Sequence, residues 1–223
     1  AIDALFAGLP VEVVWTYFEK GSPAEFIQDV NELPWNSPSW RRYFVPPNPK
    51  VVLNSLFTIN VHRAYLVKAT NSCTLALTGQ PSVLPGAWVP DALNFRGFPV
   101  DPDNLPTFDD FFASAPAHAG QPVYRLGPTG VWELVAGYSF DLNGIPVPVP
   151  GTDVMQSGEA YWVSSVGGSS YTAPLSLEVD GGDRLNFADS LTTLMLRARN
   201  LSSNQSGLFL TSLTPGQIGR AHV

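Results

Sequence analysis

Short apolar runs separated by turn residues are the feature that most limits the fold of this chain. Its 223 residues include 19 glycines and 21 prolines, and these divide the apolar segments from one another. Apolar runs of about four to eight residues bounded by Gly or Pro are typical of strands and hairpins. Residues 122–126 and 131–135, which flank the glycines of 127–130, are an example. The sequence therefore predicts a mainly β fold with tight turns.

Composition narrows the function classes. Hydrophobic residues make up 44% of the chain and aromatic residues 12%, which is enough to form a core. The net charge of −7 argues against nucleic-acid binding, which normally needs a basic patch. No apolar run approaches the roughly 18 residues of a membrane-spanning helix. The single cysteine, Cys73, excludes an internal disulfide, and we interpret it as a small buried residue in a strand.

The chain also repeats itself. Three short segments recur in the same order: 2–7 as 108–113, 15–21 as 124–130, and 63–67 as 159–163. Self-similarity of this kind predicts duplicated structural units. We therefore expect two tandem antiparallel β modules, each with a short helical turn, at residues 1–85 and 86–177.

The two predicted modules differ in two places. The second opens with 93–102, which has no counterpart before Ala1, so the first module is expected to lack its first strand. That strand's absence should leave an unpaired strand edge or an exposed apolar groove. The first module has extra residues around 34–49, which predicts an insertion there. Proline-rich 145–150 is expected at a sheet edge, because proline has no N–H to donate.

The second module resembles repeat units of long bacterial exported proteins. The residues that carry the resemblance are those of segments 94–102, 111–112, 124–132 and 158–163. The resemblance implies an extracellular or cell-surface protein whose partners are other modules of the same polypeptide, and it supplies no catalytic residues. Residues 178–217, with apparent strands near 185–187, 191–200 and 207–211, resemble the opening strands of an immunoglobulin-like sandwich. A complete sandwich of this kind needs about 100 residues, so this segment is predicted to be partial.

Both ends of the chain look cut. The first residue is not Met and no signal-like segment follows it, so we expect the chain to begin after a processed signal or in the middle of a protein. Residues 218–223 spell the translation of a common sequencing adapter, which suggests a fragment of environmental sequence. An ordinary polar tail is the alternative, and codons that differ from the adapter would support it.

Surface aromatic residues beside arginines are the best sequence candidates for binding. They lie in the predicted insertion and have no counterpart expected in the second module: Trp35, Trp40, Arg41, Arg42 and Tyr43. Aromatic and arginine side chains are enriched where proteins bind partners, so a glycan or a surface protein is the expected ligand. The alternative is that the flanking prolines fold these rings down as a lid. Large residues at recurring places, such as Trp132 and Trp162, are interpreted as core.

Two acidic pairs are weak candidates for calcium. Asp101 with Asp103, and Asp180 with Asp183, offer the oxygen ligands that calcium prefers, but neither has EF-hand spacing. We favour turns in which these side chains bond their own backbone. No other cofactor is expected.

The sequence offers little for catalysis. It contains no G-x-S-x-G elbow. His118 is interpreted as a surface-loop residue, and Asp109 with Asp110 as acids at a helix start. We therefore expect a non-catalytic structural, adhesion or ligand-binding region. The alternative is a fragment of a secreted hydrolase acting on carbohydrate, which Asp109, His118 and Glu133 in one cleft would favour; Glu133 with Glu159 is the other carboxylate pair considered.

Overall fold

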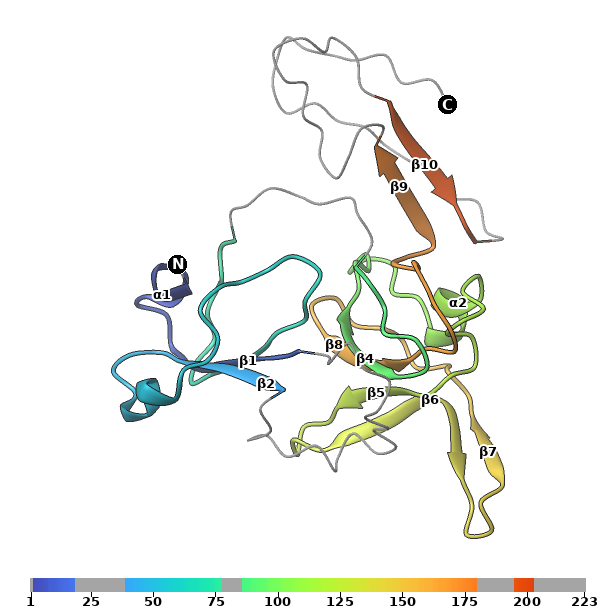
Figure 1. The fold of residues 1–223 in the computed structure, drawn as a ribbon, viewed down its shortest axis with the longest axis horizontal. Coiled ribbons are helices and arrows are strands. Elements are labelled where there is room, and N and C mark those ends of the chain that lie inside the picture. The colour runs from blue at the N-terminus through green and yellow to red at the C-terminus, as the bar shows by residue number, and fades with distance from the viewer. Residues whose placement is uncertain (1, 19–38, 78–85, 180–194, 203–223) are drawn as a thin grey trace.

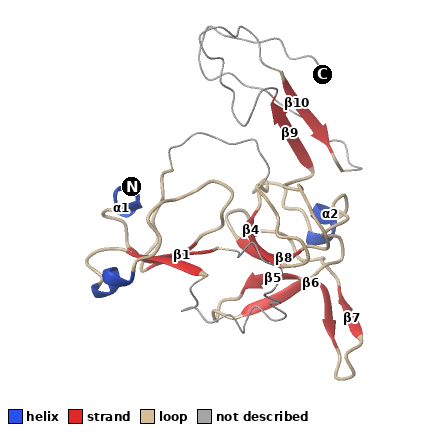
Figure 2. Cartoon of the chain, viewed as in Figure 1, coloured by secondary structure: helices blue, strands red, loops and turns tan. Residues whose placement is uncertain are grey.

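The computed structural model describes residues 2–18, 39–77, 86–179 and 195–202. These residues form three antiparallel sheets, two short α-helices and the 3-10 helix η2 at Pro49–Leu53 (Figures 1 and 2). The mainly β fold class is confirmed. Cys73 is exposed and lies outside the strands, so the prediction that it is buried in one is wrong.

The first sheet has the strand order β2-β1-β3. Its strands are β1 (Val11–Tyr17), β2 (Trp40–Phe44) and β3 (Leu66–Ala69). The central strand β1 has the sequence VEVVWTY, and β-branched and aromatic residues of this kind favour a half-buried or buried strand. The hydroxyl of Thr16, which is fully buried, donates to the carbonyl of Ala64 over 2.7 Å and so holds the chain just before β3 against β1.

The second sheet has the order β4-β8-β5-β6-β7. Its strands are listed in chain order: β4 (Leu93–Gly97), β5 (Val123–Leu126), β6 (Trp132–Phe140), β7 (Pro146–Val149) and β8 (Ala160–Ser164). The predicted strands at 122–126, 131–135 and 159–164 are thus found. The proline-rich segment is the outermost strand of this sheet, as its missing N–H groups predict.

A short helix precedes β1 in the first sheet and β5 in the second. These are α1 (Ile2–Phe6) and α2 (Phe108–Phe112). Thr107 caps α2, because its hydroxyl oxygen accepts the Asp110 N–H and its hydroxyl donates to the Asp110 carboxylate. The interpretation of Asp109 and Asp110 as acids in the first turn of a helix is confirmed.

The two sheets pair their strands in the same register. Trp15 lies opposite Leu66 in the first sheet. The residues that match them in the sequence repeat are Tyr124 and Trp162, and these two lie opposite each other in the second sheet. One tyrosine contact also recurs. The Asn60 N–H donates to the Tyr65 hydroxyl over 2.7 Å, and the Gln156 N–H donates to the hydroxyl of Tyr161 over 2.7 Å.

The register also corrects the predicted insertion. Trp40 lies opposite Tyr17 in β1, exactly where Trp132 of β6 lies opposite Leu126 of β5. Residues 40–44 are therefore a strand with a counterpart in the second sheet, and the expectation that they have none is wrong. The extra length of the first module falls between β1 and β2, in a connection that is short between β5 and β6.

The sheets pack against each other through one cluster, which we call the aromatic interface. From the first sheet and the chain just before β3 it contains Trp15, Tyr17, Trp40, Ala64 and Leu66; from the second it contains Leu93, Phe95, Tyr124, Leu126, Trp132, Ala160 and Trp162. Every member from the first sheet has its sequence or register match among the members from the second. Trp162 is fully buried at the centre, with its ring centroid 4.7 Å from that of Tyr17 and 6.0 Å from that of Trp40.

The opposite face of each sheet covers its own helix. In the first sheet the core contains Ile2 and Phe6 of α1 with Val14 of β1. In the second sheet the core contains the three phenylalanines of α2 with Val123 of β5. Successive residues of a strand point to opposite faces, so Val14 packs toward α1 while Trp15 packs into the aromatic interface.

The third sheet is a two-stranded ribbon formed by β9 (Leu175–Val179) and β10 (Leu196–Asn200). It extends away from the second sheet in Figure 1. Among the described residues β9 pairs only with β10. The strands predicted near 185–187 and 207–211 lie outside the described residues, as do residues 218–223.

A turn residue just before the matched tyrosines differs between the modules. His62 has a φ of 66° and Gly158, its sequence match, has a φ of 81°. The left-handed conformation costs a non-glycine residue about 1–2 kcal/mol. A Cβ added at Gly158 would meet no atom within 4 Å, so its effect would come from the backbone alone.

We therefore predict the same effect of alanine at both positions. His62→Ala should be less stable than His62→Gly by about 1 kcal/mol, and Gly158→Ala less stable than the unmodified chain by about the same amount. Urea unfolding at neutral pH measures both differences. Equal stability of the alanine and glycine forms at either position would contradict the matched backbone conformations.

Candidate functional site

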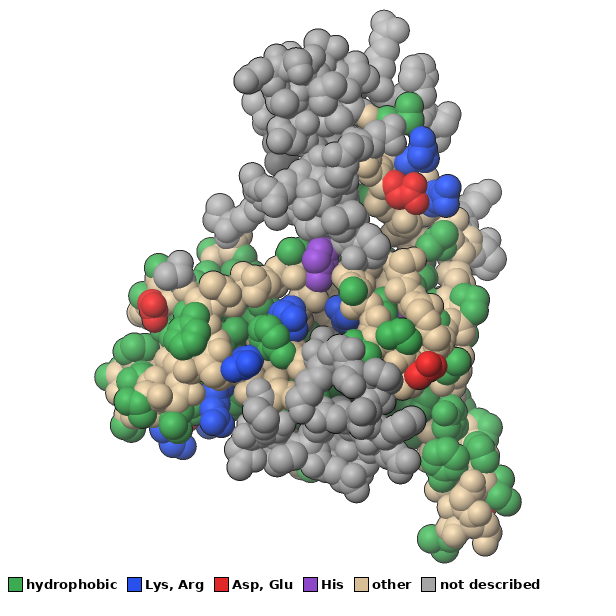
Figure 3. All heavy atoms as spheres, viewed as in Figure 1, with side chains coloured by type: hydrophobic (Ala, Val, Ile, Leu, Met, Phe, Trp, Pro, Cys, Tyr) green, Lys and Arg blue, Asp and Glu red, His purple; other side chains and the backbone are tan. Residues whose placement is uncertain are grey.

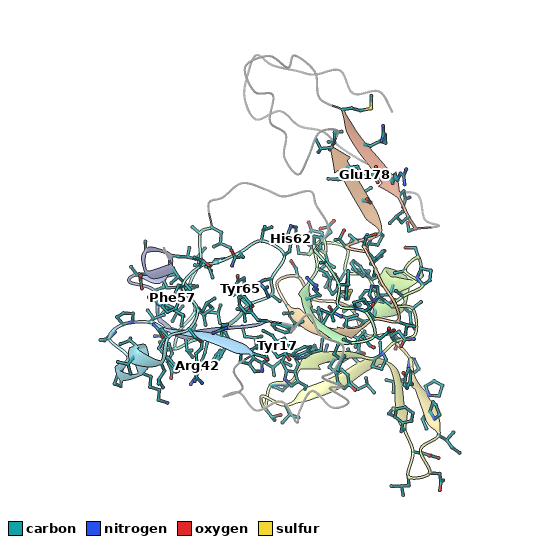
Figure 4. The ribbon with its side chains drawn as sticks, in the orientation of Figure 1. Tyr17, Arg42, Phe57, His62, Tyr65 and Glu178 are labelled. Atoms are coloured by element: carbon teal, nitrogen blue, oxygen red, sulfur yellow. The ribbon has the colours of Figure 1, made fainter. Side chains whose placement is uncertain are left out.

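A cleft of about 530 Å³ opens where the first sheet meets the second. It is lined by residues 62–65 of the first module, by Gly86, Trp88, 96–99, 158–160 and 171–173 of the second, and by Leu175 and Leu177 of β9. Figure 3 shows a histidine and basic side chains gathered beside a hollow at this junction, and Figure 4 labels His62 there. The cleft therefore brings together the two turns that carry His62 and Gly158.

Arg96 ties the two modules together at this cleft. One guanidinium nitrogen donates to the His62 carbonyl over 3.1 Å, and the other donates to the Ala87 carbonyl. The guanidinium carbon lies 5.1 Å from the centroid of the Trp88 ring. Planar guanidinium groups stack well on aromatic faces, and Arg96 is thereby held in place at the cleft.

Arg63 lies beside the same junction and packs on an aromatic ring. Its guanidinium carbon is 3.7 Å from the centroid of the Phe18 ring, and one nitrogen donates to the Tyr17 carbonyl over 3.1 Å. The guanidinium of Arg41 lies 5.7 Å from the same ring. Arg41 and Arg63 therefore form one basic surface around Phe18, with Arg41 exposed.

The aromatic residues predicted to bind a ligand lie elsewhere. Trp40 is only 3% exposed and belongs to the aromatic interface, and Tyr43 is 2% exposed in the core beneath α1. The prediction that these two rings lie on the surface is wrong, because β2 is covered on both faces. Arg42 is half-buried, and its N–H donates to the Ser55 hydroxyl. Trp35 lies outside the described residues.

The buried hydroxyl of Tyr43 has a hydrogen-bond partner on α1. It donates to the Asp3 carboxylate over 2.7 Å, so the buried polar atom has a partner. Burial, together with the negative charge of Asp3, raises the pKa of Tyr43 to about 12. The ring therefore stays neutral and joins α1 to β2.

The calcium candidates resolve into turns where they are described. The Asp103 N–H donates to the Asp101 carboxylate over 3.0 Å, which is the turn interpretation of that pair. Asp180 and Asp183 lie outside the described residues. Across 2–18, 39–77, 86–179 and 195–202, no three His, Cys, Asp or Glu side chains are placed to hold a metal ion together.

His118 is buried, not on the surface as predicted. Its imidazole is 1% exposed, with its ring centroid 4.0 Å from that of Trp88. Nδ1 lies 3.1 Å from the Ser164 carbonyl oxygen and Nε2 lies 2.8 Å from the Ser169 hydroxyl. Because a carbonyl only accepts, Nδ1 carries the hydrogen and Nε2 accepts from Ser169. Burial lowers the pKa of His118, and nearby Arg96 lowers it further.

Ser169 and His118 are as close to each other as a catalytic nucleophile and its base, but their other hydrogen bonds are made to the backbone. The Ser169 oxygen also accepts the Tyr171 N–H over 3.1 Å, and a backbone carbonyl holds the imidazole where a triad has a carboxylate. Asp109 and His118 line one cavity of about 150 Å³, but Glu133 does not. Asp109 accepts the Gly151 N–H over 3.1 Å. The three-residue cleft expected of a hydrolase is not formed.

Glu159, the remaining candidate acid, supports a buried tyrosine. Its carboxylate accepts the Tyr161 hydroxyl over 3.0 Å. Burial raises the pKa of Tyr161, and the charge of Glu159 acts in the same direction. The cleft also contains His62 and Arg96, which the sequence did not single out as site residues. The available signal for His62 was that a histidine stands where the second module has the turn glycine Gly158.

The buried imidazole predicts a pH dependence of stability. An unfolded histidine has a pKa near 6.5, whereas the folded pKa of His118 is lower, so the unfolded chain binds more protons between the two values. The stabilisation is complete above about pH 6.5 and is lost as the pH falls through that value toward the folded pKa.

The measurement is urea unfolding from pH 7.5 to pH 5. His118→Asn, which keeps a donor for the Ser164 carbonyl, should reduce the loss of stability on acidification. An identical pH dependence with and without His118 would show that the imidazole is not held neutral.

Comparison with known proteins finds no family model, curated protein or solved structure that matches this chain. In the described part of the chain, no helix is long and apolar enough to cross a membrane.

Proposed function

We propose that the chain is a non-catalytic region of an exported or cell-surface bacterial protein, in which two tandem modules form one rigid structural unit. The observation that supports this most is the aromatic interface, to which the two sheets contribute matched residues. An interface that uses the same positions of both partners is what a duplicated module provides. The modules would act as a spacer or as an adhesion unit within a longer polypeptide.

The interface supports a mechanical role because its rings are buried and in direct contact. Across the interface, Tyr17 lies 4.7 Å from Trp162, and Trp40 lies 5.5 Å from Phe95 and 6.0 Å from Trp162, measured between ring centroids. Aromatic pairs at such distances contribute about 0.5–1.5 kcal/mol each beyond the burial of their surface. Several such pairs between the modules would fix their relative orientation, as a spacer requires.

The cleft supports a binding role within the same unit. Arg63 and Arg96 provide positive charge there, and the rings of Tyr65, Trp88 and Tyr171 provide apolar surface. Planar rings beside guanidinium groups suit sugars, acidic groups or a loop of a surface protein. We therefore place the adhesion or glycan contact at this cleft instead of at Trp40 and Tyr43.

A secreted hydrolase acting on carbohydrate is the second candidate. Only the contact of 2.8 Å between Ser169 and His118 favours it. The burial of His118 and the second hydrogen bond to Ser169 argue for a structural role instead. The two proposals differ in whether removal of the Ser169 hydroxyl changes any activity.

Antibodies raised against residues 1–177 test the structural proposal in cells that produce the full-length protein. We expect them to label intact cells as strongly as permeabilised cells. In parallel, the purified chain and its Ser169→Ala variant are assayed for sugar release from polysaccharides, with no difference expected. Labelling restricted to permeabilised cells would contradict surface location, and sugar release that is lost with Ser169→Ala would establish the hydrolase.

A further inference from the structure

The two sheets differ at one equivalent edge. In the second sheet β8 has β5 on one side and β4 on the other. In the first sheet β3 occupies the place of β8 and pairs with β1, but no strand of the described chain pairs with its other side. This is the edge that the sequence comparison predicted to be unpaired. An unpaired edge presents N–H and C=O groups that another strand can bind.

The backbone groups at this edge can be assigned from the neighbouring hydrogen bonds. The Thr70 N–H donates to the Pro10 carbonyl, toward the β1 side. Because N–H and C=O groups alternate along a strand, those of Val67 and Ala69 point away from β1. The second sheet shows the same alternation. The Ser164 N–H donates to the carbonyl of Pro122, just before β5, and the Ser165 N–H donates to the carbonyl of Ala92, just before β4.

An exposed apolar side chain lies on the edge strand itself. Val67 is 43% exposed, whereas its sequence match Val163 is 0% exposed. In the second sheet Val163 shares a core with Trp88 and Phe98, which flank β4. The first sheet therefore has apolar surface where the second is covered by β4 and its flanks.

We propose that the uncovered edge of β3 binds an extended segment of the β4 type as an antiparallel strand. The register of the second sheet places Phe95 opposite Trp162, so the incoming strand would place an aromatic residue opposite Leu66. An apolar residue two positions before it would face the aromatic interface, as Leu93 does. The backbone bonds give affinity and the alternate side chains give specificity.

This inference rests on the module equivalence within the proposed function, and it names how one module joins another segment. A peptide with the sequence of residues 86–100 is the probe, because it contains β4 with Trp88 and Phe98. We expect it to bind the full chain and to protect the amides of Val67 and Ala69 from hydrogen exchange. Cell-surface labelling does not enter this test, so its failure is separate from failure of the proposed location.

A proline at the edge provides the sharpest variant. Val67→Pro removes an outward N–H and keeps the pairing with β1, because a proline is tolerated on an edge strand. We expect at least about a tenfold loss of peptide affinity, the size expected for a lost backbone hydrogen bond and its neighbours. Val67→Thr keeps the N–H and should bind the peptide normally.

Four outcomes would overturn the proposal. The first is the absence of peptide binding to the unmodified chain, and the second is protection that appears only at β8, which would show exchange with the chain's own β4. The third is self-association of the chain that Val67→Pro abolishes without any effect on the peptide, which would make a second copy the occupant. A peptide with Phe95→Asp should not bind, and its equal binding would contradict the stated side-chain chemistry.

Discussion

The packing of Trp162 against aromatic rings from the other sheet is the contact on which the arrangement depends. Trp162 is fully buried, and it touches Tyr17 and Trp40 of the first sheet as well as its own neighbours. A tryptophan side chain buries about 150–250 Å². Each sheet packs on its helix with one face, so the aromatic interface covers the face that would otherwise be open to water, and neither sheet is complete without the other.

This constraint also explains the location of the cleft. The aromatic interface brings the turn at His62 beside the end of β4, where Arg96 donates to the His62 carbonyl. The cleft therefore exists only in the assembled pair of modules. A ligand bound there would contact both modules, so the proposed spacer and binding roles would share one structure.

The sequence predicted the parts of the fold that depend on local patterns. Gly and Pro marked the strands around 127–130, and the acids at 109–110 marked a helix start. It failed where long-range packing decides the outcome. Residues 40–44 share only a tryptophan with β6, so their strand was mistaken for an inserted loop. His118 lies in a polar-looking loop, and its burial depends on Ser164, Ser169 and Trp88, which are distant in the sequence.

A double-mutant cycle between Tyr17 and Trp162 tests the central claim most directly, because these residues join the two modules with ring centroids 4.7 Å apart. The free energy of unfolding is measured for Tyr17→Leu, Trp162→Leu and the double variant. The control cycle combines Tyr17→Leu with Phe140→Leu, because Phe140 is exposed. The packing of equivalent faces predicts a coupling of about 0.5–1.5 kcal/mol for Tyr17 with Trp162 and none for Tyr17 with Phe140. Additive effects in both cycles would contradict it.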